Sequence, residues 1–129
     1  MTPRAVIDTN VLVSAPLSDK GNPAAILDMA SDGLLTPIYC QRILDEYAEV
    51  LSRPRFNFPR NIIDAALDTF KIHGIAIDPP QSVFPMPDEK DRVFYDTAVS
   101  GGATLITGNL KHYPGEPFIV SPAGFIAGL

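Results

Sequence analysis

Short apolar runs alternate with amphipathic segments along the whole chain. Five runs rich in apolar and β-branched residues are predicted to be strands: 5–7, 34–39, 75–77, 104–107 and 118–120. Apolar residues at helical spacing predict helices over 24–30, 41–51, 62–73 and about 90–100, and a last short helix after Pro122. Strands that alternate with helices favour a parallel sheet covered on both faces. We therefore expect an α/β protein, a three-layer α/β/α sandwich around a central, mainly parallel sheet of about five strands.

Glycine and proline mark the boundaries of these elements. Gly33 and Gly74 follow two of the predicted helices, in the position of C-terminal caps. Residues 78–87 contain four of the 13 prolines and are predicted to form an extended loop. The sequence shows no internal repeat and no low-complexity tract, so we expect a single domain over residues 1–129.

Composition narrows the range of functions. The chain has 46% hydrophobic and 19% charged residues, which is ordinary for a globular protein. Its formal net charge of −5 argues against broad, nonspecific binding of nucleic acid, but it leaves open an acidic site that meets nucleic acid through a metal ion. The single Cys40 excludes an internal disulfide and fits a reducing compartment, and we interpret it as a small core residue rather than a nucleophile. No stretch approaches the roughly 20 apolar residues of a membrane span. The first residues lead directly into a predicted strand and lack a signal-peptide pattern, so we expect a cytoplasmic protein without membrane contact.

Polar residues follow two of the predicted strands. Asp8 ends the run 5–7, and Asn109 follows the run 104–107 across a single glycine. An acid at the end of a buried strand is costly unless its charge is compensated, and this end of an open α/β sheet is where ligands bind. Asp8 is therefore either a metal-binding carboxylate or a turn-forming cap. Asn109 is either part of the same site or a routine turn residue.

The helix 41–51 carries three acids and an apolar stripe. At about 100° per residue, Asp45 and Glu49 fall opposite the stripe, whereas Glu46 falls at its margin. Glu46 is either a boundary residue, whose methylene groups cover the core while its carboxylate reaches water, or an acid of the site.

Acids also open the helix that begins near residue 90. Asp88 is placed to cap it, and Asp91, three residues later, is placed to complete a capping box. Asp91 shares one helix face with Phe94 and Ala98, however, so it points along the predicted buried side. Both interpretations stay open. Asp96 falls roughly opposite this face and is expected to be solvated.

In a parallel sheet these positions converge. Asp8 and Asn109 would lie at one rim, and Glu46 and Asp91 in the early turns of helices that start from it. Several carboxylates around one point cannot all ionise without a cation, and oxygen ligands favour Mg²⁺ or Mn²⁺. Such a site would activate a water and neutralise charge on a phosphoryl group, so the pattern favours phosphodiester hydrolysis.

Four segments resemble, in the same order, the motifs of PIN-domain nucleases. They are Val6–Leu12, Ile43–Tyr47 with the following Arg53–Phe56, Asp88–Tyr95, and Thr104–Asn109. The spacing from Asp91 to Thr107 also matches the one that this family has between its third acid and its strand-end threonine. The resemblance covers nearly the whole chain and is closest to the VapC-like toxins of bacterial toxin–antitoxin systems.

The resemblance implies an endoribonuclease that depends on Mg²⁺ or Mn²⁺ and acts as the toxin of a type II toxin–antitoxin pair. Its catalytic and metal-binding acids would be Asp8, Glu46 and Asp91, with Asn109 as a further metal ligand where the family often has a fourth acid. Supporting residues would be Thr9, Asn10, Thr107 and Asp96. The implied partners are an RNA substrate, a cognate antitoxin and a second copy in a homodimer. Because Asn109 carries no charge, the alternative is a catalytically weak PIN-fold module that binds RNA or a partner protein without cleavage.

An RNA substrate also requires positive groups. Arg53, Arg55 and Arg60 cluster beside the second predicted helix, and Lys111 and His112 follow the last motif. They form either an RNA-binding rim or an ordinary solvated surface, and Arg53, Arg55 and Lys111 are our candidates for substrate binding. We interpret His112 as a surface loop residue rather than a metal ligand.

Two other enzyme classes place acids at strand ends. Haloacid-dehalogenase-type phosphatases need a second aspartate two residues after the first, where this chain has Asn10. Response-regulator receivers need paired acids early in the chain, and this pair is missing, although Asp78 follows the predicted third strand. Both classes are therefore disfavoured.

Overall fold

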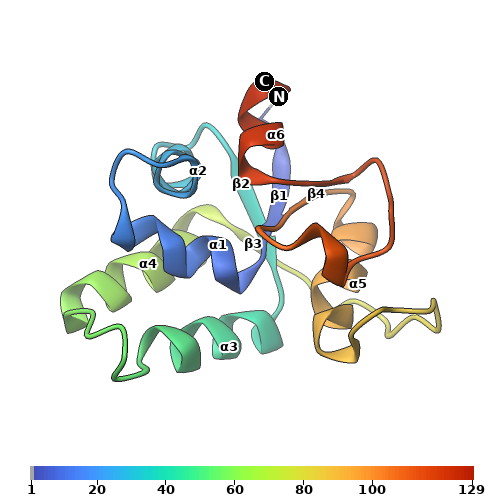
Figure 1. The fold of residues 1–129 in the computed structure, drawn as a ribbon, viewed down its shortest axis with the longest axis horizontal. Helices are drawn as coiled ribbons and strands as arrows, with labels where there is room; N and C mark the ends of the chain where they lie inside the picture. The colour runs from blue at the N-terminus through green and yellow to red at the C-terminus, as the bar shows by residue number, and fades with distance from the viewer. Residues whose placement is uncertain (1) are drawn as a thin grey trace.

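A computed structural model describes residues 2–129 (Figure 1). Its centre is a five-stranded sheet with the order β3-β2-β1-β4-β5, in which all four neighbouring pairs are parallel. The strands are β1 (Arg4–Ile7), β2 (Thr36–Tyr39), β3 (Ile75–Ala76), β4 (Thr104–Ile106) and β5 (Ile119–Val120). The predicted α/β class and parallel sheet are confirmed.

Helices cover both faces of this sheet. The α-helices are α1 (Thr9–Ser14), α2 (Asn22–Ser31), α3 (Gln41–Leu51), α4 (Arg60–His73), α5 (Arg92–Gly101) and α6 (Pro122–Ala127). Three short 3₁₀ turns are η1 (Ala15–Leu17), η2 (Glu89–Asp91) and η3 (Leu110–His112). Figure 1 shows α1, α2 and α4 on one side of the sheet and α5 on the other, so the three-layer arrangement is also confirmed. None of the helices within residues 2–129 combines the length and the apolar character that crossing a lipid bilayer requires.

The central strand anchors the core. Ala5, Val6 and Ile7 of β1 are completely buried, as expected for a strand with helices on both faces. Tyr47 on the apolar stripe of α3 is also fully buried, and its hydroxyl donates a hydrogen bond to the carbonyl oxygen of Ile7. This contact fixes α3 beside the carboxyl end of β1. Cys40 is a free thiol in the core, as predicted.

No helix is predicted directly after Asp8, whereas the structure has α1 there. This helix is only six residues long and contains Val11 and Val13, whose β-branched side chains are not typical of helices. Too few residues are present for a helical period to show. Because α1 begins at Thr9, only Asp8 separates it from the end of β1, and this residue lies at the turn between the two elements.

Candidate metal-binding site

The carboxyl ends of β1 and β4 bring Asp8 and Thr107 together. Ile7 lies opposite Ile106 in the sheet, and the backbone N–H of Asp8 donates to the carbonyl of Ile106 at 2.9 Å. The hydroxyl of Thr107 donates to Oδ2 of Asp8 at 2.8 Å, and the backbone N–H of Thr9 donates to Oδ1 at 2.8 Å. Asp8 therefore caps α1 and at the same time lies at the rim of the sheet, so its two interpretations are compatible.

Glu46 and Asp91 extend toward Asp8 from α3 and from the beginning of α5. Glu46 is half-buried and accepts a hydrogen bond from the hydroxyl of Thr9. Asp91 precedes α5, but its side chain caps no backbone N–H; Asp88 instead caps η2, accepting from the N–H of Lys90 at 3.0 Å. Oδ2 of Asp91 is shielded from solvent and has no hydrogen-bond partner among residues 2–129. The capping-box interpretation of Asp91 is therefore wrong.

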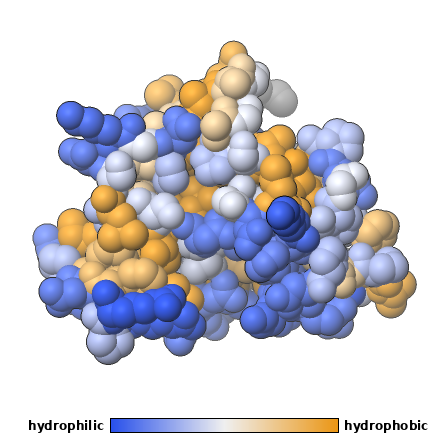
Figure 2. Space-filling model, viewed as in Figure 1, coloured by the Kyte–Doolittle hydropathy of each residue, from blue (hydrophilic) through white to orange (hydrophobic). Residues whose placement is uncertain are grey.

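One open cleft of about 750 Å³ joins these side chains. Its walls include Asp8, Glu46, Asp91 and Asn109, and it extends along α3 to Arg53 and Arg55. Hydrophilic residues dominate the centre and lower edge of the face in Figure 2, over α3 and the beginning of α5. The convergence expected from the sequence is thus present in the structure.

The carboxylates in this cleft repel one another. Burial raises the pKa of Asp8, although hydrogen bonds from Thr107, Tyr113 and Thr9 act in the opposite direction. Burial and the negative charges of Asp8 and Asp88 raise the pKa of Asp91 to about 6. Within the described part of the chain, no lysine or arginine forms an ion pair with Asp8 or Asp91. The unpartnered oxygen of Asp91 and the set of carboxylate donors fit a divalent cation such as Mg²⁺ or Mn²⁺.

Tyr113 is a site residue that the sequence analysis missed. Its side chain is buried, and its hydroxyl donates to Oδ2 of Asp8 at 2.9 Å. Burial and the nearby charges of Asp8 and Asp91 raise the pKa of Tyr113, so it remains a donor. A single tyrosine in a loop belongs to no pattern of spacing, and the sequence contains no signal that would have identified it.

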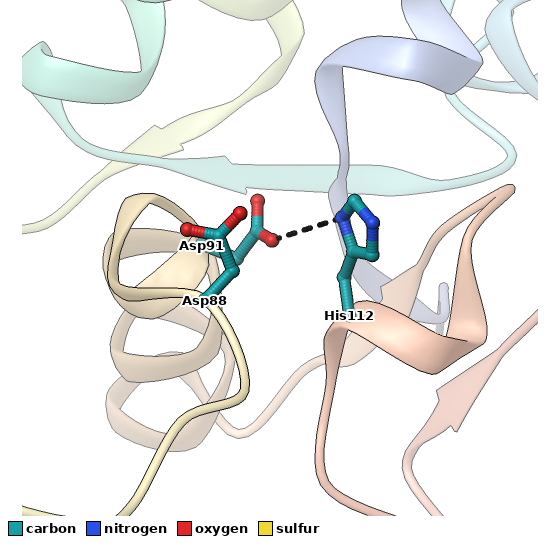
Figure 3. A group of neighbouring side chains, drawn as sticks. All are labelled: Asp88, Asp91 and His112. Carbon is teal, nitrogen blue, oxygen red and sulfur yellow. Dashed lines mark ion pairs between the residues drawn. The ribbon is translucent and has the colours of Figure 1, made fainter.

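His112 lies on an exposed turn, as predicted, and it also lines the cleft. Half of its side chain is exposed, but its Nδ1 lies 3.3 Å from Oδ2 of Asp91 (Figure 3). Its Nε2 lies 2.9 Å from the side-chain amide nitrogen of Asn109. Asn109 is therefore at the rim of the cleft, as predicted, and contacts the imidazole.

Of the other two predicted supporting residues, Asn10 lies at the cleft and Asp96 does not. Oδ1 of Asn10 accepts from the backbone N–H of Gly108 at 2.9 Å, which ties α1 to the turn after β4. The prediction that Asp96 is solvated is wrong: it is 5% exposed, and its Oδ2 accepts from the N–H of Ser82 at 3.0 Å. Asp96 lines a separate cavity of about 320 Å³ beside Arg92, so the structure does not bring it into the cleft.

Two of the three candidates for substrate binding line the cleft, and the third does not. Arg53 and Arg55 line the cleft; Arg53 pairs with Glu49 at 2.9 Å, and the Arg55 guanidinium lies 4.7 Å from the ring centroid of Phe56. Lys111 is exposed and does not line the cleft. Lys90 does line the cleft, although it was not among the predicted substrate-binding residues.

Replacing Asp91 with asparagine is expected to stabilise the protein when no metal is present. Since its folded pKa of about 6 exceeds the reference value of 3.8, folded Asp91 retains its proton longer than the unfolded chain as pH rises. The wild-type free energy of unfolding should therefore fall between about pH 4 and 6, a loss that the asparagine variant avoids. We expect the variant to gain about 2 kcal/mol at neutral pH and almost nothing near pH 4. Urea unfolding in EDTA at several pH values measures this.

Asp68 provides the matched control for this experiment. It is exposed on α4 and does not line the cleft, so Asp68→Asn should change the free energy of unfolding by less than about 0.5 kcal/mol at every pH. Equal stability of Asp91→Asn and wild type at neutral pH would show that burial and the neighbouring charges do not raise the pKa of Asp91.

Comparisons with known proteins agree with this geometry. The family model described as PIN domain matches residues 4–111. An uncharacterized protein of Methanocaldococcus jannaschii, MJ1680, is 29% identical over 109 residues, which cover 82% of this chain and 70% of that protein. The crystal structure of VapBC2 from Rickettsia felis, bound to a DNA fragment from its promoter, contains a similar chain. Its TM-score is 0.56 at 18% sequence identity, with 92% of this chain and 96% of that chain covered, which shows the shared fold. The chain therefore belongs to the PIN domain family, whose members are generally nucleases.

Proposed function

We propose that this protein is an endoribonuclease that hydrolyses RNA phosphodiester bonds with the help of Mg²⁺ or Mn²⁺. The observation that carries the proposal is the convergence of Asp8, Glu46 and Asp91 in one open cleft. Asp8 and Glu46 lie close enough to Asp91 for their charges to raise its pKa, and no lysine or arginine among the described residues pairs with Asp8 or Asp91. A divalent cation would supply the missing positive charge.

Asp8, Glu46 and Asp91 would hold the ion, with Asn109 at the rim as a further candidate ligand. A bound divalent ion activates a water for attack on phosphorus and stabilises the leaving oxygen. Hydrolysis of this kind leaves a 5′-phosphate and a 3′-hydroxyl, and no nucleophilic side chain takes part.

The neighbours of the acids keep them in place for this chemistry. The hydroxyl groups of Thr107 and Tyr113 both donate to Oδ2 of Asp8, and the N–H of Thr9 donates to Oδ1, so the carboxylate cannot rotate freely. The hydroxyl of Thr9 orients Glu46 in turn. One short segment at the end of β1 therefore positions two of the three acids.

The RNA strand would follow the cleft along α3. Arg53 and Arg55 lie at its far end and Lys90 lines it nearer the acids, so we propose that these side chains contact phosphates. Lys111 stays a candidate for contacts beyond the cleft. Because the whole protein carries a net charge of −5, these local basic groups must provide the attraction for the RNA backbone.

We further propose that the protein is the toxin of a type II toxin–antitoxin pair and acts in the cytoplasm as a homodimer. Its similarity to a chain of the VapBC2 complex supports a cognate antitoxin as partner. We therefore expect expression of this protein alone to slow growth, and co-expression of its antitoxin to restore it. A gene for a small protein directly upstream would be the first place to look for this antitoxin.

Labelled RNA incubated with the purified protein tests the nuclease proposal. We expect cleavage with Mn²⁺ or Mg²⁺, no cleavage in EDTA, and recovery when metal is added in excess, because the acids alone cannot activate a water. Product ends should carry 5′-phosphates. Binding of RNA without cleavage under all metal conditions would contradict the proposal. That outcome would favour the binding-module alternative, which the uncharged Asn109 supports.

A further inference from the structure

We propose that His112 is a ligand of the metal ion in this cleft, where its imidazole nitrogen replaces the carboxylate that is missing at Asn109. The proposal rests on the metal site described under the proposed function and adds a nitrogen donor to it. Its consequence is a preference for Mn²⁺, which accepts nitrogen ligands, over Mg²⁺, which strongly favours oxygen ligands.

The imidazole of His112 lies close to two acids at the edge of the cleft. Figure 3 shows Asp88 and Asp91 at the beginning of α5, facing His112 from η3. One carboxylate oxygen from each acid and one ring nitrogen of His112 all lie within 4.8 Å of one another. Ligand atoms about 2.1 Å from an ion are about 3 Å apart when they occupy neighbouring positions on it. The 3.3 Å between Nδ1 of His112 and Oδ2 of Asp91 is close to this separation.

The contact between His112 and Asp91 leaves a buried carboxylate oxygen without a hydrogen bond. Although Nδ1 is near Oδ2 of Asp91, that oxygen has no hydrogen-bond partner among residues 2–129 and is shielded from solvent. The two atoms are thus close without forming a directed hydrogen bond. A buried carboxylate oxygen in this state is costly, and an ion that binds both atoms would remove the cost.

Asn109 contacts the second ring nitrogen of His112. A metal-binding imidazole normally uses its second nitrogen to donate a hydrogen bond to a fixed acceptor. Nε2 of His112 lies 2.9 Å from the side-chain amide of Asn109. A flip of this amide exchanges its nitrogen and oxygen, which gives Nε2 an acceptor and leaves Nδ1 free for the ion. An aspartate at this position would compete for the ion itself, whereas the neutral Asn109 is suited to orient His112.

Metal titration of the purified protein tests the proposal without any measurement of cleavage. We expect wild type to bind Mn²⁺ at least about tenfold more tightly than Mg²⁺, and His112→Ala to lose about tenfold in Mn²⁺ affinity with a much smaller loss for Mg²⁺. His73→Ala is the matched control, because His73 is the second of the two histidines and is exposed at the end of α4. Asn109→Asp combined with His112→Ala should restore binding but abolish the preference for Mn²⁺.

Pulsed electron paramagnetic resonance of the Mn²⁺ complex gives the direct readout. Wild type and His73→Ala should show coupling of the Mn²⁺ electron spin to a ligand nitrogen, and His112→Ala should not. Absence of nitrogen coupling in wild type, or equal losses of Mn²⁺ and Mg²⁺ affinity in His112→Ala, would overturn the proposal.

Asp8→Asn separates this inference from the proposed function. If Asp8→Asn abolishes binding of both ions while His112→Ala changes neither, the carboxylate site stands and the role of His112 is refuted. If wild type shows nitrogen coupling but does not cleave RNA, the role of His112 stands and the nuclease proposal fails. If wild type binds neither ion, both are refuted.

Discussion

Asp8→Asn is expected to reduce metal-dependent RNA cleavage by about 10³-fold, which corresponds to roughly 4 kcal/mol of transition-state stabilisation. The substitution keeps the size of the side chain but removes the negative charge at the most constrained position of the cleft. Asp8 is only 6% exposed, and its two carboxylate oxygens accept from Thr9, Thr107 and Tyr113. No other carboxylate is held at this point, so none can take over its role. Initial cleavage rates of labelled RNA at saturating Mn²⁺ provide the measurement.

The variant should remain folded, which separates loss of a ligand from loss of structure. An asparagine can still accept the N–H of Thr9 and cap α1, and burial of a neutral side chain costs less than burial of the carboxylate whose pKa is already raised. Circular dichroism should therefore show an unchanged fold without metal. Asp68→Asn on α4 serves as the activity control and should cleave at the wild-type rate. Near-wild-type cleavage by Asp8→Asn would show that the chemistry takes place elsewhere.

The positions of four polar residues of the cleft were predictable because each lies in, or next to, a predicted strand or helix. Asp8 and Asn109 follow buried strands, and the ends of parallel strands meet at one rim. The helical phase of Asp91 with Phe94 and Ala98 correctly predicted that it faces inward, and the margin position of Glu46 predicted a half-buried acid.

Asp96 was wrongly expected to be solvated from its helical phase, and the reason is physical. A helical projection assumes one buried face and one solvated face, but α5 is covered on both. The sheet covers the side of Phe94, and the loop before η2 covers the other, where Ser82 donates to Asp96. Whether a distant loop folds over a helix is decided by tertiary contacts that no local pattern contains.

Residues that contact the acids from loops were also beyond prediction. Tyr113 and Asp8 are hydrogen-bonded across 105 positions of sequence, and His112 reaches Asp91 from a single 3₁₀ turn. Such contacts depend on how the chain returns to the rim after β4. Asp8, Glu46 and Asp91 can be found from the sequence because each lies in or beside a predicted strand or helix. The sequence does not show which isolated loop side chains complete the site.

Gly74 ends α4 as predicted, but a different property of glycine is needed at this position. The sequence suggests a helix cap, for which glycine is usual because it adopts a positive φ. In the structure Gly74 follows α4 with a φ of −92°, which any residue can adopt. What requires glycine is space, because a Cβ at this position would lie 2.5 Å from the carbonyl oxygen of Phe70 and 2.9 Å from that of Pro37.

Gly74→Ala is therefore expected to lower the free energy of unfolding by about 3 kcal/mol, the upper end of the usual cost of overpacking. Both obstructing atoms are backbone oxygens, one in the last turn of α4 and one in β2, so no side chain can rotate away. The ring of Tyr39 at 3.0 Å closes the third side. Relief would require α4 and β2 to separate, which would expose apolar surface between a helix and the sheet. Urea unfolding followed by circular dichroism measures the loss.

Gly115 offers the matched control for this substitution. A Cβ at Gly115 would meet nothing within 4 Å, and its φ is not positive, so Gly115→Ala should change the free energy of unfolding by less than about 1 kcal/mol. The difference between the two variants isolates the contact at Gly74 from the general effect of replacing a glycine on the unfolded chain. If Gly74→Ala proves as stable as Gly115→Ala, the end of α4 does not approach β2 as closely as described.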